Sequence, residues 1–248
     1  MVRIRFLVVV VIGFAGGFFS PCESRGDIVY DPALQFDTVN NPSTKGPWTL
    51  GWTNTLGGGF NNLPTSGSNG NIFGWVGPGI TVVDFNTDTI NVGAISSVRW
   101  LPGQIRISPG TNGEFGVIRF TAPATGMYNL LASFSGNDIF APSTDVYVLV
   151  NSVTQFNGIV NTAWGSSGPG IPGAGPSFTQ QTFLALGNTV DFAVGNQNGS
   201  ASFDSTGFTG LITAVPEPNS LIMASIAGVA LLWKRRRRLN QSLNGVDQ

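Results

Sequence analysis

Short runs of alternating apolar and polar residues, each ended by Gly, Pro or Asn, occupy the middle of this chain and most constrain its fold. Residues 189–194 place three apolar side chains on one face and Asp191 on the other. Such alternation is typical of half-buried antiparallel strands. Seven runs of this kind are the predicted strands: 80–85, 116–121, 127–134, 145–151, 178–184, 189–194 and 207–213. We therefore predict an all-β fold, a single jelly-roll-like β-sandwich over residues 27–214.

Two stretches between these runs lack alternation. Residues 48–79 are predicted to be loop-rich, with several aromatic residues among glycines. Residues 165–176 are almost entirely Gly, Ser and Pro and are predicted to form a flexible loop between strands, because strand patterns continue beyond them.

The composition of the chain excludes several classes of function. Charged residues make up 10% of the chain, against about 25% in an average soluble protein. Residues 27–214 hold ten acidic and four basic residues, a net charge of −6, so no nucleic-acid partner is expected. The chain contains no histidine and one cysteine, Cys22, so no intrachain disulfide forms and the common general base is missing.

The amino-terminal residues 1–24 have the pattern of a secretory signal peptide. Arg3 and Arg5 precede an apolar and glycine run over residues 6–19, and Pro21 and small residues follow. Cleavage by signal peptidase after Ser24 or Gly26 fits the small-residue rule. A lipoprotein modified at Cys22 and an uncleaved anchor helix are the alternatives.

The carboxy-terminal end has the most specific pattern in the sequence. Val215-Pro216-Glu217-Pro218 cannot be helical, because proline fixes φ and favours extended geometry in the residue before it. Residues 221–233 carry no charge and are predicted to form a transmembrane helix that contacts membrane lipid, although the stretch is short for a span of about 20 residues. The basic cluster that follows is predicted to stop transfer and stay in the cytoplasm, and it consists of Lys234, Arg235, Arg236, Arg237 and Arg238.

Residues 215–238 strongly resemble the PEP-CTERM family of sorting signals, because motif, spacer, apolar stretch and basic cluster occur in that order. The resemblance implies recognition by exosortase, a membrane-embedded cysteine transpeptidase of Gram-negative bacteria, at Pro216, Glu217 and Pro218. It also implies export, residence in the inner membrane during processing, and a final place in the cell envelope, at the surface or in the extracellular matrix. The tail 239–248 is longer than is usual for the family and is predicted to be cytoplasmic.

Two patterns in the middle resemble jelly-roll domains. Residues 117–128 and 184–192 are similar to adjacent strands of carbohydrate-binding modules and C1q-like domains. Residues 41–51 resemble the opening segment of secreted planctomycete-type proteins. These resemblances imply a fold rather than an activity.

No catalytic site is predicted, and the chain is not expected to be an enzyme. Ser/His/Asp and Cys/His arrangements need a histidine. A glycosidase needs only two carboxylates, and the candidates are Glu114, Asp138, Asp145, Asp191 and Asp204. None lies in a recognisable motif, so we interpret them as surface charges or turn caps.

The candidate ligand-binding residues are Trp164, Trp75, Asp138 and Asp145. Exposed tryptophan faces stack on sugars, and Trp164 lies beside the open loop 165–176. Asp138 and Asp145 could supply oxygen ligands to calcium, but their spacing matches no calcium loop, so neither a metal nor a cofactor is predicted.

The prediction is therefore an exported, exosortase-processed, non-enzymatic envelope or surface protein that binds polysaccharide or belongs to a matrix. The alternative is a secreted carbohydrate-active hydrolase with a carboxylate pair. A carboxylate pair in a cleft would favour the hydrolase, an aromatic strip without such a pair would favour the binding protein, and neither would favour a purely structural role.

Overall fold

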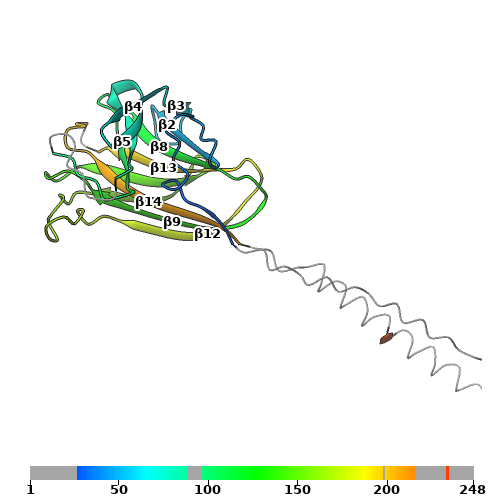
Figure 1. Cartoon of the computed structure of the whole chain (residues 1–248). Helices are drawn as coiled ribbons and strands as arrows, with labels where there is room; N and C mark the ends of the chain where they lie inside the picture. The colour runs from blue at the N-terminus through cyan, green and yellow to red at the C-terminus, as the bar shows by residue number, and fades with distance from the viewer. Residues whose placement is uncertain (1–26, 89–96, 198, 216–232, 235–248) are drawn as a thin grey trace, which may run out of the picture.

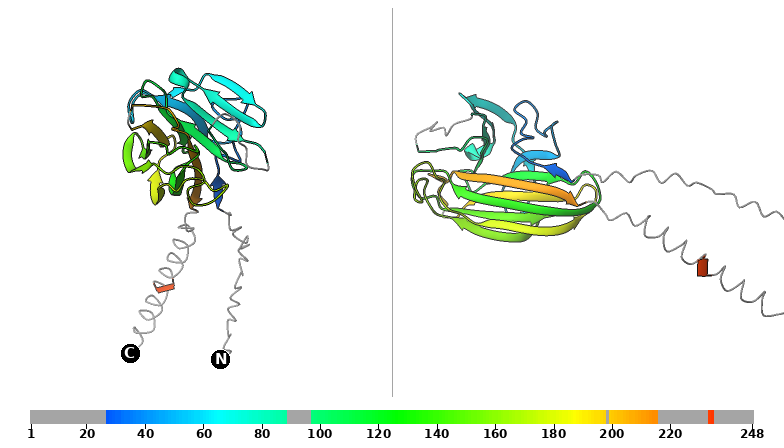
Figure 2. Two further views of the ribbon diagram at one scale, coloured as in Figure 1. Left: turned by 90° about the vertical axis from the view of Figure 1, so that its left-hand side faces the viewer. Right: turned by 60° about the horizontal axis from the view of Figure 1, so that its bottom comes forward.

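The computed structural model describes residues 27–88, 97–197, 199–215 and 233–234. The strands form two antiparallel sheets that pack face to face, so the fold is an all-β two-sheet sandwich (Figures 1 and 2). A single turn of 3₁₀ helix, η1 (Pro78–Ile80), connects two strands of the first sheet.

The first sheet has eight strands. In spatial order they are β12 (Ser177–Leu184), β9 (Gly126–Gly136), β14 (Thr206–Val215), β7 (Ile105–Ser108), β6 (Val82–Asn86), β5 (Ile72–Val76) and β4 (Thr65–Asn69). The short β1 (Ile28–Tyr30) pairs with the far end of β14, Ile28 opposite Ala214.

The second sheet has six strands. Their order is β11 (Val153–Val160), β10 (Thr144–Val150), β13 (Thr189–Asn196), β8 (Phe115–Thr121), β2 (Trp48–Thr53) and β3 (Asn61–Asn62). From β7 onward most connections pass from one sheet to the other, so each loop closes an end of the sandwich.

All seven predicted strands are present, with ends within two residues of the predicted ones. The loop 165–176 lies between β11 and β12, as predicted. The prediction that residues 48–79 are loop-rich was wrong, since they contain β2, β3, β4 and β5. These strands are held by backbone pairing to neighbours, and β4, with the sequence TSGSN, has no apolar residue that could alternate.

The core lies between the sheets and is rich in aromatic rings. Along β9 the inward side chains are Tyr128, Leu130, Ala132 and Phe134, and all four are buried. On β13, Phe192 packs against Phe208 of the opposite sheet, with ring centroids 4.9 Å apart. Burial of such side chains contributes roughly 1.5–3 kcal/mol each.

The carboxylates interpreted as surface charges are mostly buried, which corrects that interpretation. Asp191 faces away from the core as predicted, but it forms a bidentate ion pair with Arg119. The Arg119 guanidinium lies 3.9 Å from the Phe60 ring centroid. Glu114, Asp138 and Asp204 are also buried. Glu114 does cap a turn, because it accepts hydrogen bonds from the backbone and side chain of Asn112.

The two ends of the sandwich differ in what they carry. β1 and the end of β14 lie side by side, so the described domain begins and ends at the same end (Figure 1). The opposite end carries four loops between the sheets: 109–114, 137–143, 161–176 and 197–205. We call it the loop end.

The signal peptide, residues 221–232 of the predicted transmembrane helix, the sorting motif and Arg235, Arg236, Arg237 and Arg238 lie outside the residues that the structure describes. Trp233, the last residue of that predicted helix, is described, helical and exposed. Lys234 is described and is exposed. Within the described residues no helix has the length and apolar character needed to cross a bilayer.

Candidate ligand-binding groove

A groove of about 360 Å³ opens at the loop end, on the outer face of the first sheet. It lies over β6, β7 and the start of β14. Its walls combine hydroxyls and one guanidinium with apolar side chains. The polar lining residues are Ser97, Arg106, Ser108, Asp138, Ser202 and Ser205, and the large apolar ones are Ile80, Val82, Val98 and Phe203.

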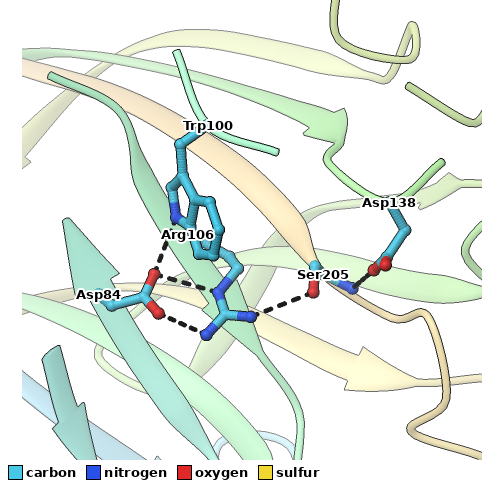
Figure 3. Close-up of polar contacts among 5 residues, drawn as sticks. All are labelled: Asp84, Trp100, Arg106, Asp138 and Ser205. Atoms are coloured by element: carbon cyan, nitrogen blue, oxygen red, sulfur yellow. Dashed lines mark hydrogen bonds and ion pairs between the residues drawn. The ribbon is translucent and has the colours of Figure 1, made fainter. Parts of the chain in front are cut away.

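Arg106 forms the floor of the groove and is fixed by the register of two strands. Asp84 of β6 and Arg106 of β7 lie directly opposite each other. Arg106 Nε donates to Asp84 Oδ1 at 3.0 Å, and a second guanidinium nitrogen pairs with Asp84 Oδ2 (Figure 3). Such a bidentate pair fixes the guanidinium and the carboxylate in one orientation, and their opposite charges compensate each other.

The buried Trp100 supports this ion pair. Its Nε1 donates to Asp84 Oδ1 at 3.0 Å, and its ring lies 4.9 Å from the Arg106 guanidinium carbon (Figure 3). The third nitrogen of Arg106 donates to Ser205 Oγ at 3.3 Å. Arg106 is therefore held rigidly where it lines the groove, and its charge is compensated by Asp84.

Asp138 joins several loop-end segments. Its carboxylate accepts the Ser97 hydroxyl through Oδ1. It also accepts the Ser205 backbone N–H through Oδ2 at 2.9 Å, the bond drawn in Figure 3. Its carbonyl accepts the Trp164 N–H at 2.6 Å. Because Asp138 is buried, these bonds fix the 97–98, 161–176 and 197–205 segments around the groove.

Two exposed phenylalanines form an aromatic pair beside the groove. The ring centroids of Phe140 and Phe203 lie 4.7 Å apart, although 54% and 46% of the two residues are exposed. Phe203 also lines the groove. Exposed aromatic rings in mutual contact are a surface that water disfavours and that a ligand with apolar faces would cover.

The backbone is strained at two positions on the groove wall. Ile80, which is 68% exposed, has φ +56°, and Phe203 has φ +64°. A β-branched or bulky residue rarely adopts this left-handed conformation, and such outliers concentrate at functional sites. Both residues lie at the groove, so the strain places apolar side chains where a ligand would bind.

Asp204 fixes the spacing of the two loops that carry the aromatic pair. Its Oδ1 accepts the backbone N–H of Ser143 at 2.8 Å and the Ser143 hydroxyl at 3.2 Å. Oδ2 is buried and has no hydrogen-bond partner among the described residues. Burial raises the pKa of this carboxyl, and the charges of Asp138 and Asp145 raise it further against the lowering effect of Ser143.

The structure places the four predicted ligand-binding residues in different environments. Asp138 lies in the groove, and Trp164 is partly exposed and bonded through its backbone to Asp138. Trp75 is buried instead of exposed, and its Nε1 donates to the carbonyl of Asp37 at 2.9 Å. Asp145 lies on the second sheet, where it accepts the Tyr147 phenol at 2.8 Å.

The Asp145 carboxylate is bonded to Tyr147 on the second sheet and does not line the groove. Burial and the Asp145 carboxylate raise the pKa of Tyr147 to about 12, so the phenol stays a donor. In the part of the chain that the structure describes, no three acidic or cysteine side chains are arranged to hold a metal ion.

Sequence reasoning missed Arg106, Ser205, Phe140 and Phe203. The serine and the arginine carry no local signal, because their partners lie far away in the sequence. The two phenylalanines do carry one: each is a large apolar residue inside a turn-rich stretch, where no strand pattern explains it.

Comparisons with known proteins give distant structural similarities alone. No family model matches this chain, and no curated protein matches it. A carbohydrate-binding module of family 51 from Clostridium perfringens, solved with methyl-galactose, is similar to 57% of this chain over 92% of its own, with 12% identity and a TM-score of 0.34. A family 35 module from Clostridium thermocellum is similar to 60% of this chain over 95% of its own, with 14% identity and a TM-score of 0.30.

An adhesin domain of the Lys-gingipain of Porphyromonas gingivalis shows a similar distant likeness, with 15% identity and a TM-score of 0.31 over 53% of this chain and 85% of its own. These likenesses are distant structural similarities among β-sandwiches. The function is therefore argued from the groove itself.

Proposed function

We propose that this chain is an exported, exosortase-processed envelope or surface protein that binds polysaccharide through the loop-end groove. The observation that carries the binding proposal is the exposed Phe140–Phe203 pair beside a groove lined by hydroxyls and Arg106. A sugar ring offers apolar C–H faces and a rim of hydroxyls. An aromatic surface next to ordered polar groups suits both, because a few placed polar groups orient a ligand and the apolar area binds it.

The charges of the groove favour an uncharged glycan. Arg106 is neutralised by Asp84, and the Asp138 carboxylate already accepts two hydrogen bonds. A strongly charged ligand would find no unpaired opposite charge on this floor. Hydroxyl groups, which both donate and accept, suit the serine side chains of the walls.

The same contacts argue against the alternative, a hydrolase with a carboxylate pair. Glycoside hydrolysis needs an acid and a second carboxylate about 5–9.5 Å apart, both able to reach the scissile bond. Asp138 is the one carboxylate among the described residues that lines the groove, and it is buried under its hydrogen-bond partners. Asp84 is buried as well and is paired with Arg106. We therefore propose a binding protein and not an enzyme.

The position of the groove also suits a protein held by its carboxy-terminal end. Val215, the last described residue of β14, lies at the end of the sandwich opposite the groove. If residues 215–238 act as a sorting signal and membrane stop, the groove lies at the end of the sandwich farther from the membrane. We further class the sandwich as a jelly roll, since β7–β14–β9–β12 and β8–β13–β10–β11 follow the eight-strand order of two Greek keys.

Glycan-array binding followed by affinity electrophoresis in polysaccharide gels tests the binding proposal. Phe203→Ala and Phe140→Ala are each expected to weaken binding about tenfold, since covering half a phenylalanine is worth roughly 1–1.5 kcal/mol. Phe183→Ala is the matched control, because Phe183 is an equally exposed phenylalanine far from the groove. Equal affinity of all three variants and the parent would contradict the proposal.

A truncated chain that ends at Val215 tests the sorting proposal. It should be released from the envelope and should lack the change in mass that processing leaves. The Pro216→Ala/Pro218→Ala variant should instead stay in the membrane unprocessed, because the membrane stop is intact. If the truncated chain were retained and matured like the parent, exosortase would not be its route.

A further inference from the structure

The outer face of the first sheet carries an apolar patch at the end where the described domain stops. Outward side chains of β12, β9 and β14 lie in rows set by the strand register. Phe183, Met127 and Val215 form the last row, and Leu131 and Leu211 pair two rows further along. Between these rows Val29 of β1 lies opposite Thr213. We call these six apolar side chains the tail-side patch.

The patch is exposed and uncharged. Phe183 is 60% exposed, Val29 50% and Leu131 41%. None of the outward residues of β9, β12 and β14 is charged. The same face becomes polar toward the loop end, where Ser177, Ser133 and Thr209 form the corresponding row. The row between the two apolar rows consists of Gln181, Asn129 and Thr213. Exposed apolar side chains that gather at one end of an uncharged sheet face mark an interaction surface.

The position of the patch identifies what covers it. Five residues, 216–220, separate Val215 from the uncharged segment 221–233, and five residues of extended chain span at most about 18 Å. Phe183 lies two strands from Val215, which is about 10 Å. A bilayer that receives the segment therefore lies within reach of every side chain in the patch.

We propose that the tail-side patch rests on the lipid surface of the membrane that holds the carboxy-terminal segment. The inference depends on the proposed membrane stop. A second copy of the chain fits less well, because a stable interface takes about 20–30 residues a side and the patch has six apolar side chains. A tethered domain needs far less contact, since tethering raises the effective concentration of the lipid surface to the millimolar range.

Fluorescence quenching in vesicles tests this contact on the full chain. The Cys22→Ser background leaves no other thiol. A polarity-sensitive probe is attached at Gln181→Cys, which lies in the patch between Phe183 and Leu131, or at Ser133→Cys, on the same face toward the loop end. Each chain is reconstituted into vesicles of phosphatidylethanolamine and phosphatidylglycerol with brominated acyl chains.

The expected result is a blue-shifted emission at position 181 and quenching at least about twofold stronger than at position 133, since an apolar face sinks about 5–10 Å into the headgroup boundary. Adding Phe183→Ser and Leu131→Ser should remove the difference. Equal quenching at the two positions in chains that float with the vesicles would overturn the patch alone. An emission shift that depends on the protein-to-lipid ratio without quenching would overturn it in favour of a second copy. Chains that fail to float would overturn the membrane stop, and the patch proposal with it.

Discussion

The rings of Phe140 and Phe203 lie 4.7 Å apart although the two residues come from separate loops, and the bond between Asp204 and Ser143 fixes that spacing. Ser143 closes the loop that carries Phe140, and Asp204 directly follows Phe203. The Asp204 carboxylate therefore positions the aromatic pair by joining the two loops that carry it. It does so at a cost, because one of its oxygens is buried without a partner among the described residues.

We predict that Asp204→Asn stabilises the protein at neutral pH by about 1 kcal/mol, because it removes a buried negative charge that lies near the charges of Asp138 and Asp145. The desolvation cost of a buried, unpartnered polar group is about 1–3 kcal/mol and is larger when the group is charged. The amide oxygen still accepts from Ser143. The pKa of Asp204 is raised by burial and by neighbouring carboxylates, so the folded state favours the protonated form. The parent therefore gains stability as the pH falls through the folded pKa toward 3.8, and its difference from the variant shrinks.

Urea denaturation of parent and variant between pH 4 and 7 measures this. Ser143→Ala is the control, since it removes one donor and leaves the carboxyl in place. A variant that is less stable than the parent at pH 7 would show that the carboxylate is a net stabilising group.

Asp37 should behave in the opposite way. Burial acts to raise its pKa, but backbone N–H groups of Val39, Thr44 and Asn40 and the Thr44 hydroxyl outweigh burial and lower it. The ionised form is therefore favoured in the folded state. Its contribution to stability is complete above the ordinary value of 3.8 and is lost as the pH falls below that value.

We predict that Asp37→Ala costs about 2 kcal/mol at pH 7, since it leaves three backbone donors without their acceptor. The loss should be smaller at pH 3 than at pH 7. Thermal unfolding at both pH values checks it, with Asp31→Ala as the control for a carboxylate that caps an exposed turn. An equal loss at the two pH values would rule out a contribution from the charge.

The strands that could be predicted from the sequence are those whose alternation survives into the structure. β13 buries Val190, Phe192 and Val194 against the opposite sheet, and the pattern alone located it. β5 was missed because Gly74 interrupts its pattern. The structure gives that glycine a packing role: a Cβ there would lie 2.6 Å from Cβ of Asp84 on the neighbouring strand.

The groove could not be predicted in the same way, because its parts come from distant positions. Arg106 pairs with Asp84 because β6 and β7 place the two residues opposite each other, and it reaches Ser205 in the loop that precedes β14. Local sequence cannot give either distance. Asp138 was predicted as a ligand-binding residue because its carboxylate could supply oxygen ligands, yet what makes it part of the site is its bonds to Ser97 and Ser205, which depend on the complete fold.

The buried Asp84–Arg106 ion pair predicts that breaking it with one substitution costs more stability than replacing both residues. Arg106→Met should cost about 3 kcal/mol, because it leaves the Asp84 charge buried without its partner. Adding Asp84→Asn to that variant should recover part of the loss, since the amide oxygen still accepts from Trp100 and the charge is gone. Chemical denaturation of the two single variants and the double variant gives the coupling. Additive losses would mean that the pair is not coupled in the folded state.

The strained backbone at Ile80 predicts that relieving the strain raises stability and weakens glycan binding. The left-handed conformation of Ile80 costs about 1–2 kcal/mol in steric strain. Glycine adopts this conformation without strain, at an entropic cost of about 0.5–1 kcal/mol on folding. Because the Ile80 side chain is largely exposed and little packing is lost, Ile80→Gly should stabilise the protein by about 0.5–1 kcal/mol while weakening glycan binding. Leu186→Gly is the matched control, since Leu186 is 69% exposed and is not among the positive-φ residues, so glycine there should only destabilise. Denaturation and affinity electrophoresis on both variants measure the two effects together. A loss of stability in Ile80→Gly equal to that in the control would mean that the conformation at Ile80 carries no strain.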